Sequence, residues 1–304
     1  MAETVLEVQD LSVTFRMYDQ GLEQRDLRVI HRLNLSVKEG EILAAAGSSG
    51  SGKSLLAHAI LGILPGNAKT TGEMRYYGQT LTPALQKKLR GAAMALVPQS
   101  VEYLDPLMRV ETQVLGVRGS REKQRALFQR YRLPETAGKL FPFQLSGGMA
   151  RRVLVAAAAM EEPKLIIADE PTPGMGAAMA RTAMGHFQEL ARAGAAVLLI
   201  THDLDLAFTY ADRIAVFYAG TTLETAPAED FRTGQALRHP YSRALWAAVP
   251  QHGFIPAPGR QPYAASLGEG CPYAPRCHQK TEICEKPVPM RPLRGGEVAC
   301  VHAL

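Results

Sequence analysis

The eight residues Gly47–Ser54, with the sequence GSSGSGKS, constrain the fold of this chain of 304 residues more than any other segment. They satisfy the pattern G-x-x-x-x-G-K-[ST] in full. The apolar run Glu41–Ala46 before them is typical of a buried strand, and the apolar run Leu55–Leu64 after them is typical of a helix. Strand, glycine-rich loop and helix in this order predict an α/β protein with a phosphate-binding loop.

The loop residues have expected roles toward a nucleoside triphosphate and its Mg²⁺ ion. Glycines allow backbone N–H groups to converge on phosphate oxygens, and the positive end of the following helix adds to the attraction. The Lys53 ammonium would neutralise the β and γ phosphates, and the Ser54 hydroxyl would ligate Mg²⁺. The predicted nucleotide-binding residues of the loop are Gly47, Ser48, Ser49, Gly50, Ser51, Gly52, Lys53 and Ser54.

Two adjacent acids follow the apolar run Lys164–Ala168. In an α/β sheet the carboxyl end of a buried strand meets the ligand crevice. Asp169 is therefore predicted to contact Mg²⁺, and Glu170 is predicted to be the general base that polarises the attacking water. The expected chemistry is hydrolysis of the nucleoside triphosphate.

Hydrophobic patterning predicts the other elements. Alternating runs at Leu6–Phe15 and Val29–Val37 predict an antiparallel pair of strands joined by a polar loop over Arg16–Leu27. An amphipathic helix is expected over Ala177–Ala193. Further strands are predicted at Met94–Val97, Lys164–Ala168, Ala195–Ile200, Arg213–Tyr218 and Thr221–Glu224.

Changes in composition divide the chain. From about residue 100 to residue 160 the pattern turns helical and more charged, and Pro, Gly and Cys accumulate after Pro250. We expect an ATPase domain over residues 1–250, with a helical subdomain at about 100–160. A small Cys-containing C-terminal module is expected over 251–304.

A second anion-binding helix start is predicted at Leu145–Met149, because the sequence LSGGM precedes an alanine-rich helix. One nucleotide cannot easily use two such helix starts of the same chain. A head-to-tail pair of ATPase domains avoids this conflict, since each nucleotide would lie between the phosphate loop of one subunit and the Ser-Gly-Gly segment of the other. The expected nucleotide contacts of this segment are Leu145, Ser146, Gly147 and Gly148.

Together these motifs resemble the ATP-binding cassette (ABC) ATPase family over about the first 250 residues. Gly47–Ser54 is similar to its Walker A motif, Ile166–Glu170 to its Walker B motif and Leu145–Met149 to its signature. The resemblance implies ATP and Mg²⁺ as ligands. It also implies a P-loop cassette with a mixed core sheet, an antiparallel β subdomain and a helical subdomain.

Three further residues take their expected roles from this resemblance. Gln99 resembles the Q-loop glutamine that senses Mg²⁺ and contacts the membrane subunit, and His202 resembles the switch histidine that holds the γ-phosphate. Phe15 resembles the aromatic residue that stacks on adenine. With the residues above, the predicted catalytic residues are Glu170, His202, Lys53 and Gln99, and the predicted Mg²⁺ contacts are Ser54, Gln99 and Asp169.

Three segments narrow the resemblance to the ATPase subunits of dipeptide, oligopeptide and nickel importers: Leu145–Val153, Pro240–Leu245 and Cys271–Cys277. The resemblance implies a peripheral subunit on the cytoplasmic face of the inner membrane. Its implied partners are a second ATPase, two membrane permeases and an extracytoplasmic binding protein. Peptides are the expected cargo, whereas Leu61–Glu73 resembles the nickel branch and makes nickel or a metal chelate the alternative. The basic segment Arg118–Arg132 is expected to face the permeases.

Two positions depart from the family pattern. The D-loop aspartate of the family is replaced by Gly176, and the glutamine that commonly follows the signature by two residues is replaced by Arg151. Both positions are expected at the dimer interface, so we predict a heterodimer with asymmetric nucleotide sites. A regulatory subunit that binds ATP without hydrolysing it is the alternative that these departures raise.

All four cysteines lie in the last 34 residues, which indicates metal ligands before disulfides in a chain without an export signal. The spacing Cys-x5-Cys-x6-Cys-x15-Cys lacks the close pairs that are usual in zinc sites. Four thiolates suit a [4Fe–4S] cluster, and the resemblance to peptide importers implies the same group. Zinc, or no metal, is the alternative. The candidate ligands are Cys271, Cys277, Cys284 and Cys300.

Composition limits the other functional classes. The net charge of +5 is too small to indicate nucleic acid as a partner. No apolar run approaches the ~18 residues of a membrane span, and the acidic start of the chain lacks the pattern of a secretory signal. We expect a cytoplasmic protein that does not bind nucleic acid. A soluble ABC ATPase of DNA repair or translation is a more remote alternative.

Overall fold

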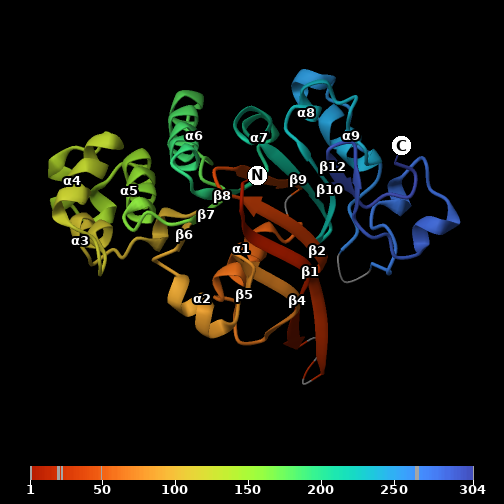
Figure 1. Ribbon diagram of the computed structural model, residues 1–304, viewed down its shortest axis with the longest axis horizontal. Coiled ribbons are helices and arrows are strands. Elements are labelled where there is room, and N and C mark those ends of the chain that lie inside the picture. Colours follow the sequence, from red (N-terminus) through yellow and green to blue (C-terminus); the bar gives the residue numbers. More distant parts are fainter. Residues whose placement is uncertain (1, 19–20, 22, 49, 264–266, 304) are drawn as a thin grey trace.

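The computed structural model describes residues 2–18, 21, 23–48, 50–263 and 267–303 of the chain. Two sheets form the body of the molecule, with strand orders β2-β1-β4-β5 and β11-β12-β10-β9-β3-β8-β7-β6. Figure 1 shows helices α3 to α5 at one side and the C-terminal segment at the opposite side. The mixed core sheet, the antiparallel sheet and the lateral helices confirm the predicted fold class.

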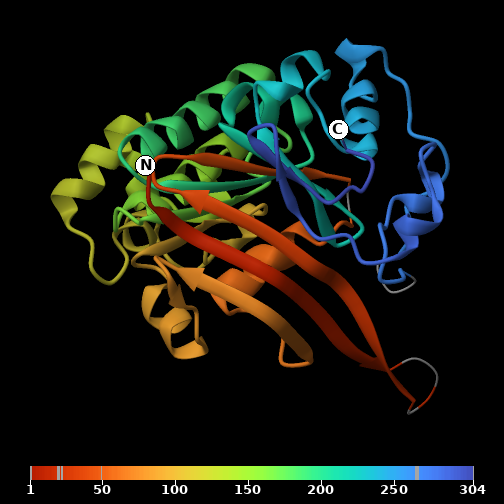
Figure 2. The ribbon, with the colours of Figure 1, turned by 45° about the vertical axis from the view of Figure 1, so that its right-hand side comes forward.

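The antiparallel sheet contains β1 (Thr4–Tyr18), β2 (Gln24–Lys38), β4 (Ala68–Tyr76) and β5 (Gln79–Thr80). The prediction of a loop over Arg16–Leu27 was wrong, because β1 and β2 stay paired as far as Tyr18 and Gln24. Figure 2 shows this hairpin projecting from the body. The side chains near the end of the hairpin are exposed on both faces of the sheet. The two strands therefore lack the hydrophobic alternation there from which a strand is predicted.

The core sheet is parallel from β6 to β9 and antiparallel beyond β9. The predicted strands at Met94–Val97 and Arg213–Tyr218 agree with β6 and β9 to the residue. The other strands of this sheet are β3 (Ile42–Gly47), β7 (Leu165–Asp169), β8 (Ala196–Thr201), β10 (Thr221–Pro227), β11 (Arg291–Leu293) and β12 (Gly296–Val298).

Helices follow the strands. Helix α1 ends three residues earlier than the predicted helix, because Gly62 adopts a left-handed φ of 65° and its N–H group caps the last turn. Among the helices of the described ranges, none is long and apolar enough to cross a bilayer. The helices are α1 (Lys53–Leu61), α2 (Pro83–Leu89), α3 (Val110–Leu115), α4 (Arg121–Arg130), α5 (Gly147–Ala159), α6 (Ala177–Arg192), α7 (Leu204–Tyr210), α8 (Asp230–Thr233) and α9 (Pro240–Ala247).

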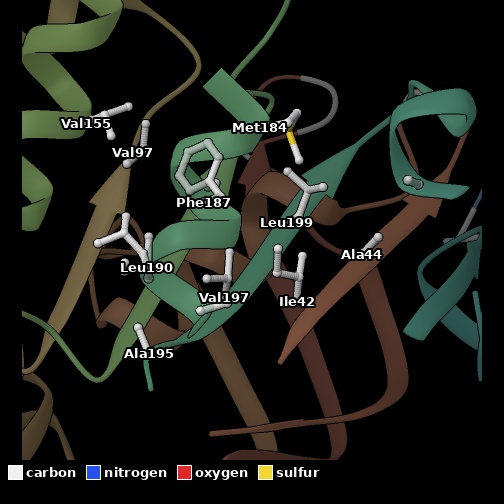
Figure 3. Packing of buried hydrophobic residues seen from close by; sticks show 14 of the residues in the cluster. Ile42, Ala44, Val97, Val155, Met184, Phe187, Leu190, Ala195, Val197 and Leu199 are labelled. Atoms are coloured by element: carbon white, nitrogen blue, oxygen red, sulfur yellow. The ribbon is translucent and has the colours of Figure 1, made fainter. Parts of the chain in front are cut away.

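Alternating side chains of the core strands fill two hydrophobic clusters. On β8, Val197 and Leu199 belong to one cluster, whereas Leu198 and Ile200 belong to the other. Figure 3 shows Phe187 of α6 packed over the first pair, beside Ile42 and Ala44 of β3. Burial on both faces accounts for the continuous apolar runs that predicted these strands. The rigid sheet holds the carboxyl ends of β3, β7 and β8 side by side.

The C-terminal segment joins the core sheet through β12, which pairs with β10 at Glu224↔Val298. A buried ion pair reinforces this connection, since the Arg238 guanidinium lies 3.2 Å from the Glu224 carboxylate and 2.7 Å from that of Asp230. Arg238 also donates from Nε to the Leu293 carbonyl at 2.6 Å. The last two strands are thus tied to β10 and to α8 by main-chain and side-chain bonds. The boundary at residue 250 stays a prediction.

Candidate nucleotide-hydrolysis site

The phosphate loop leaves the carboxyl end of β3 and enters α1. A Cβ atom at Gly47 would lie 2.3 Å from the Phe217 carbonyl oxygen, so only glycine fits against β9. Gly50 and Gly52 have φ values of 77° and 90°, which residues with a side chain rarely adopt. Ser49 lies outside the described residues. The local geometry is therefore that of a loop whose backbone N–H groups can turn inward toward an anion.

Lys53 lies within this loop with 6% of its surface exposed. Its ammonium donates to the carbonyl oxygens of Gly47 and Ser48, each at 2.9 Å, and to the Ser51 hydroxyl at 3.3 Å. Burial lowers the pKa of Lys53, and the charges of Glu170 and Asp169 oppose this shift. The ammonium is thus held at the loop by weak neutral acceptors that a phosphate oxygen can replace.

Ser54 and Asp169 form the predicted pair of oxygen donors, since the Ser54 hydroxyl donates to Asp169 Oδ1 at 3.1 Å. Asp169 ends β7 and is buried. Burial raises the pKa of Asp169, whereas the hydrogen bond from Ser54 lowers it. A hydroxyl and a carboxylate are hard oxygen ligands of the kind that Mg²⁺ prefers, so these residues fit the ion.

Glu170, which follows Asp169, lies between two of the predicted residues. Its Oε1 is 2.9 Å from His202 Nδ1, and its Oε2 accepts a hydrogen bond from Gln99 Nε2 at 3.1 Å. Glu170 has a φ of 44° and directly follows β7, the strand between β6 and β8 in the sheet. The structure thus brings together Gln99, Glu170 and His202 beside the Ser54–Asp169 pair.

The predicted signature and adenine contacts lie elsewhere in the subunit. Helix α5 begins at Gly147, and the Ser146 hydroxyl caps it by accepting from the Met149 N–H at 3.3 Å. Figure 1 places α5 in the lateral group of helices, away from α1. Phe15 lies in β1, opposite Leu27 of β2. Their roles toward a nucleotide stay predictions.

Three contacts at the site had no signal in the sequence patterns. The Ser48 hydroxyl donates to the side-chain carbonyl of Gln261, which reaches the phosphate loop from the C-terminal segment. Ser48 also hydrogen-bonds to Tyr241; burial raises the pKa of Tyr241 to about 12 despite this bond. The Arg151 guanidinium donates to carbonyl oxygens of its own chain, among them that of Gln99 at 3.0 Å, and its place at a dimer interface stays a prediction.

The four cysteines, all of which are described, are free thiols in the structure. Within the described ranges, no three His, Cys, Asp or Glu side chains form a group that could hold a metal ion. The closest partners of the thiols are histidines: Cys271 Sγ is 3.7 Å from His239 Nε2 and Cys284 Sγ is 3.5 Å from His302 Nε2. Burial raises the pKa of Cys271 to about 11, and the nearby Cys300 and Cys284 act in the same direction. The iron–sulfur cluster or zinc ion on Cys271, Cys277, Cys284 and Cys300 therefore stays a prediction.

Two family models and several solved structures are similar to this chain. The family model described as ABC transporter matches residues 30–173, and the model described as oligopeptide/dipeptide transporter, C-terminal region, matches residues 223–284. The described residues share 26% sequence identity and a TM-score of 0.63 with a dimeric post-hydrolysis ATP-binding cassette bound to ADP and phosphate. That likeness covers 73% of this chain and 98% of the cassette. Fold and site define an ABC ATPase.

Relatives of known name cover almost the whole chain. The oligopeptide transport ATP-binding protein OppD of Escherichia coli K12 is 33% identical over 98% of this chain and 93% of its own length. The probable D,D-dipeptide transport ATP-binding protein DdpD of the same organism is 32% identical over 94% and 92%. The chain therefore belongs to the ABC transporter ATP-binding proteins of the oligopeptide/dipeptide branch. Membership implies ATP and Mg²⁺ as ligands, ATPase activity coupled to transport, and membrane permeases as partners.

Proposed function

We propose that this chain is the ATPase subunit that powers an importer of dipeptides or oligopeptides. The observation that carries the proposal is the placement of Glu170 between Gln99 and His202, next to the Ser54–Asp169 pair. The match of residues 223–284 to the C-terminal region of oligopeptide/dipeptide transporters supports peptides as cargo. The relatives described above are named for peptides, which favours peptides over the nickel alternative.

ATP would bind with its phosphates over the loop from Gly47 to Ser54. The Lys53 ammonium would exchange its carbonyl partners for β and γ phosphate oxygens, a stronger charge-assisted interaction. Ser54 and Asp169, with Gln99, would hold Mg²⁺, which neutralises phosphate charge when bound. Phe15 would stack on the adenine ring.

Glu170 would act as the general base toward the attacking water. Gln99 and His202 each bond one oxygen of its carboxylate, so they fix the direction from which it accepts the proton. His202 would also hold the γ-phosphate during the reaction. Because one oxygen of Glu170 is bonded on each side, a change at either neighbour should misplace the base.

A second ATPase subunit would complete the nucleotide site. The Ser-Gly-Gly start of α5 lies apart from α1 in one subunit, so residues Leu145 to Gly148 would contact a nucleotide on the partner's loop. Gly176 offers no side-chain cap to α6 in the D-loop. This departure supports a heterodimer in which the two nucleotide sites differ. Two permeases and an extracytoplasmic binding protein would complete the transporter, with the ATPase subunits at the cytoplasmic face of the inner membrane.

Replacing Glu170 with Gln tests the assignment of the base. We expect turnover to be lost while ATP binding persists, because the amide keeps the shape of the side chain but cannot accept a proton. Glu229→Gln, at an exposed carboxylate paired with Arg232, is the matched control and should turn over normally. Undiminished hydrolysis by Glu170→Gln would refute the assignment.

Cargo is tested by uptake of labelled dipeptide and labelled Ni²⁺ in cells that lack the gene, compared with complemented cells. Loss of dipeptide uptake alone is the expected result. Loss of Ni²⁺ uptake alone would reverse the choice of cargo. Retention of both in cells without redundant importers would contradict the importer itself.

A further inference from the structure

We propose that Arg151 is a positioning residue for hydrolysis, which fixes the main chain on both sides of the Gln99–Glu170 hydrogen bond. The inference rests on the proposed role of Glu170 as base. Arg151 lies in α5, two residues after the segment Leu145–Met149.

The contacts of the Arg151 guanidinium define the device. Its Nη1 donates to the Gln99 carbonyl at 3.0 Å and to the Pro171 carbonyl at 3.4 Å, and its Nη2 donates to the Pro173 carbonyl at 3.0 Å. Pro171 directly follows Glu170. The Arg151 guanidinium on α5 therefore bonds the main chain of Gln99, whose side-chain amide donates to Glu170. It also bonds the main chain of Pro171, which follows Glu170.

The loop after Glu170 has main-chain bonds of its own, from the Glu170 N–H to the Ile200 carbonyl at 2.8 Å and from the Met175 N–H to the Thr172 carbonyl at 3.1 Å. Pro171 and Pro173 have no N–H group, and the following D-loop contains Gly174 with a φ of 74° and Gly176 without a side-chain cap. Arg151 adds side-chain donors from outside the loop to the carbonyls of Pro171 and Pro173, which satisfies two further backbone acceptors. The fixed fork of a guanidinium can serve three carbonyl oxygens from two nitrogens.

An amide or an ammonium cannot reproduce this arrangement. Glutamine carries both donors on one nitrogen, and the lysine ammonium is a point charge without the planar fork. Arg151 is half-buried and keeps its charge, so its bonds to carbonyls are of the stronger, charge-assisted kind. Its loss removes a main-chain anchor at Gln99 and another directly after Glu170, although neither residue loses its own side chain.

The expected effect is on the chemical step and not on ATP binding. Misplacement of a catalytic group by about 1 Å can cost about a hundredfold in rate. We expect Arg151→Ala to lower kcat by about tenfold to a hundredfold, with less than a twofold change in KM for ATP, because the phosphate loop is untouched. Arg151→Lys and Arg151→Gln should fall between wild type and Arg151→Ala.

The experiment compares the ATPase turnover of these variants, each as the full chain assembled in its transporter complex. The rate is divided by the amount of bound ATP to give kcat. Arg243→Ala is the matched control, because it removes a guanidinium–carbonyl bond (Nε to Leu237, 2.9 Å) in α9. A raised KM with an unchanged kcat, or a lowered Tm with an unchanged kcat, would overturn the proposal.

Hydrogen–deuterium exchange on the full chain separates this inference from the assignment of the base. Arg151→Ala should speed exchange of the amides at 99–100 and 174–176, and should leave those of α1 unchanged. Unaltered exchange in both loops would reject Arg151 as their anchor, whatever the activity. If Glu170→Gln still hydrolyses ATP while the loops loosen in Arg151→Ala, the base assignment fails and the anchoring stands.

Discussion

Replacement of Arg238 by Met should destabilise the protein strongly, because it leaves a buried carboxylate without its cation. Arg238 and Glu224 are 1% and 0% exposed at their side chains. Glu224 would keep only the N–H donors of Arg238 and His239, at 2.9 and 2.8 Å. Removal of one partner of a buried pair costs about 3–5 kcal/mol. With an unfolding entropy of about 2.1 cal/mol/K per residue, this chain should lose about 5–8 °C in Tm.

Thermal unfolding followed by circular dichroism at pH 7 measures this loss. Arg232→Met, which breaks an exposed ion pair with Glu229, is the control and should change Tm by about 1 °C or less. Adding Glu224→Gln to Arg238→Met should recover at least half of the loss, since the amide oxygen still accepts from the backbone and carries no charge. A loss below about 2 °C in Arg238→Met would refute the reasoning.

Three further changes have defined outcomes. Gly47→Ala should lower the free energy of unfolding by about 1–3 kcal/mol and weaken ATP binding, since its Cβ would meet the Phe217 carbonyl at 2.3 Å. Gly66→Ala is the control and should leave the thermal unfolding unchanged, because a Cβ there meets open space. Ser54→Ala should lower the affinity for Mg²⁺ in the presence of ATP by about tenfold, while ATP binding without Mg²⁺ persists. Calorimetric titration measures both, and an unchanged Mg²⁺ affinity would contradict the role of Ser54 as a ligand. His186→Phe should stabilise by about 1–3 kcal/mol, because both ring nitrogens are buried without a hydrogen-bond partner in the described structure. Burial lowers the pKa of His186, so the imidazole of the unfolded chain takes up its proton first as the pH falls through about 6.5. This protonation destabilises the wild-type protein but not His186→Phe. The gain in stability of the variant, measured by urea unfolding, should therefore be larger at pH 5 than at pH 8. Equal gains at both pH values would contradict this.

The elements that sequence patterns predicted well are those whose pattern follows from burial. Strands such as Met94–Val97 are apolar on both faces, so a short apolar run marks them. The Ser54–Asp169 contact follows from motif and topology, because β3 and β7 end at the same edge of the sheet. Resemblance to a family supplied Gln99 and His202, which no local pattern distinguishes from ordinary polar residues.

Contacts between distant segments could not be predicted from patterns. One partner of Arg151 is the carbonyl of Gln99, 52 positions away, and any residue offers a carbonyl. Gln261 reaches Ser48 across 213 positions from a segment of Pro and Gly. The clustering of the cysteines indicated a metal, but no three His, Cys, Asp or Glu side chains of the described ranges form a group that could hold one, so that prediction stays untested. Such contacts depend on how distant segments of the chain pack together and not on local propensity.

The pairing of β12 with β10 sets an order of assembly during synthesis. Strands β3, β6, β7, β8, β9 and β10 are all made by residue 227, whereas β12 begins at residue 296. At about 5–20 residues per second, the ribosome needs roughly 3–14 s to make the intervening segment. For that time the outer edge of β10 has no strand beside it, and an open edge can pair with another chain. The nascent protein therefore passes through an interval of exposure to aggregation that ends when the C-terminal hairpin closes the sheet.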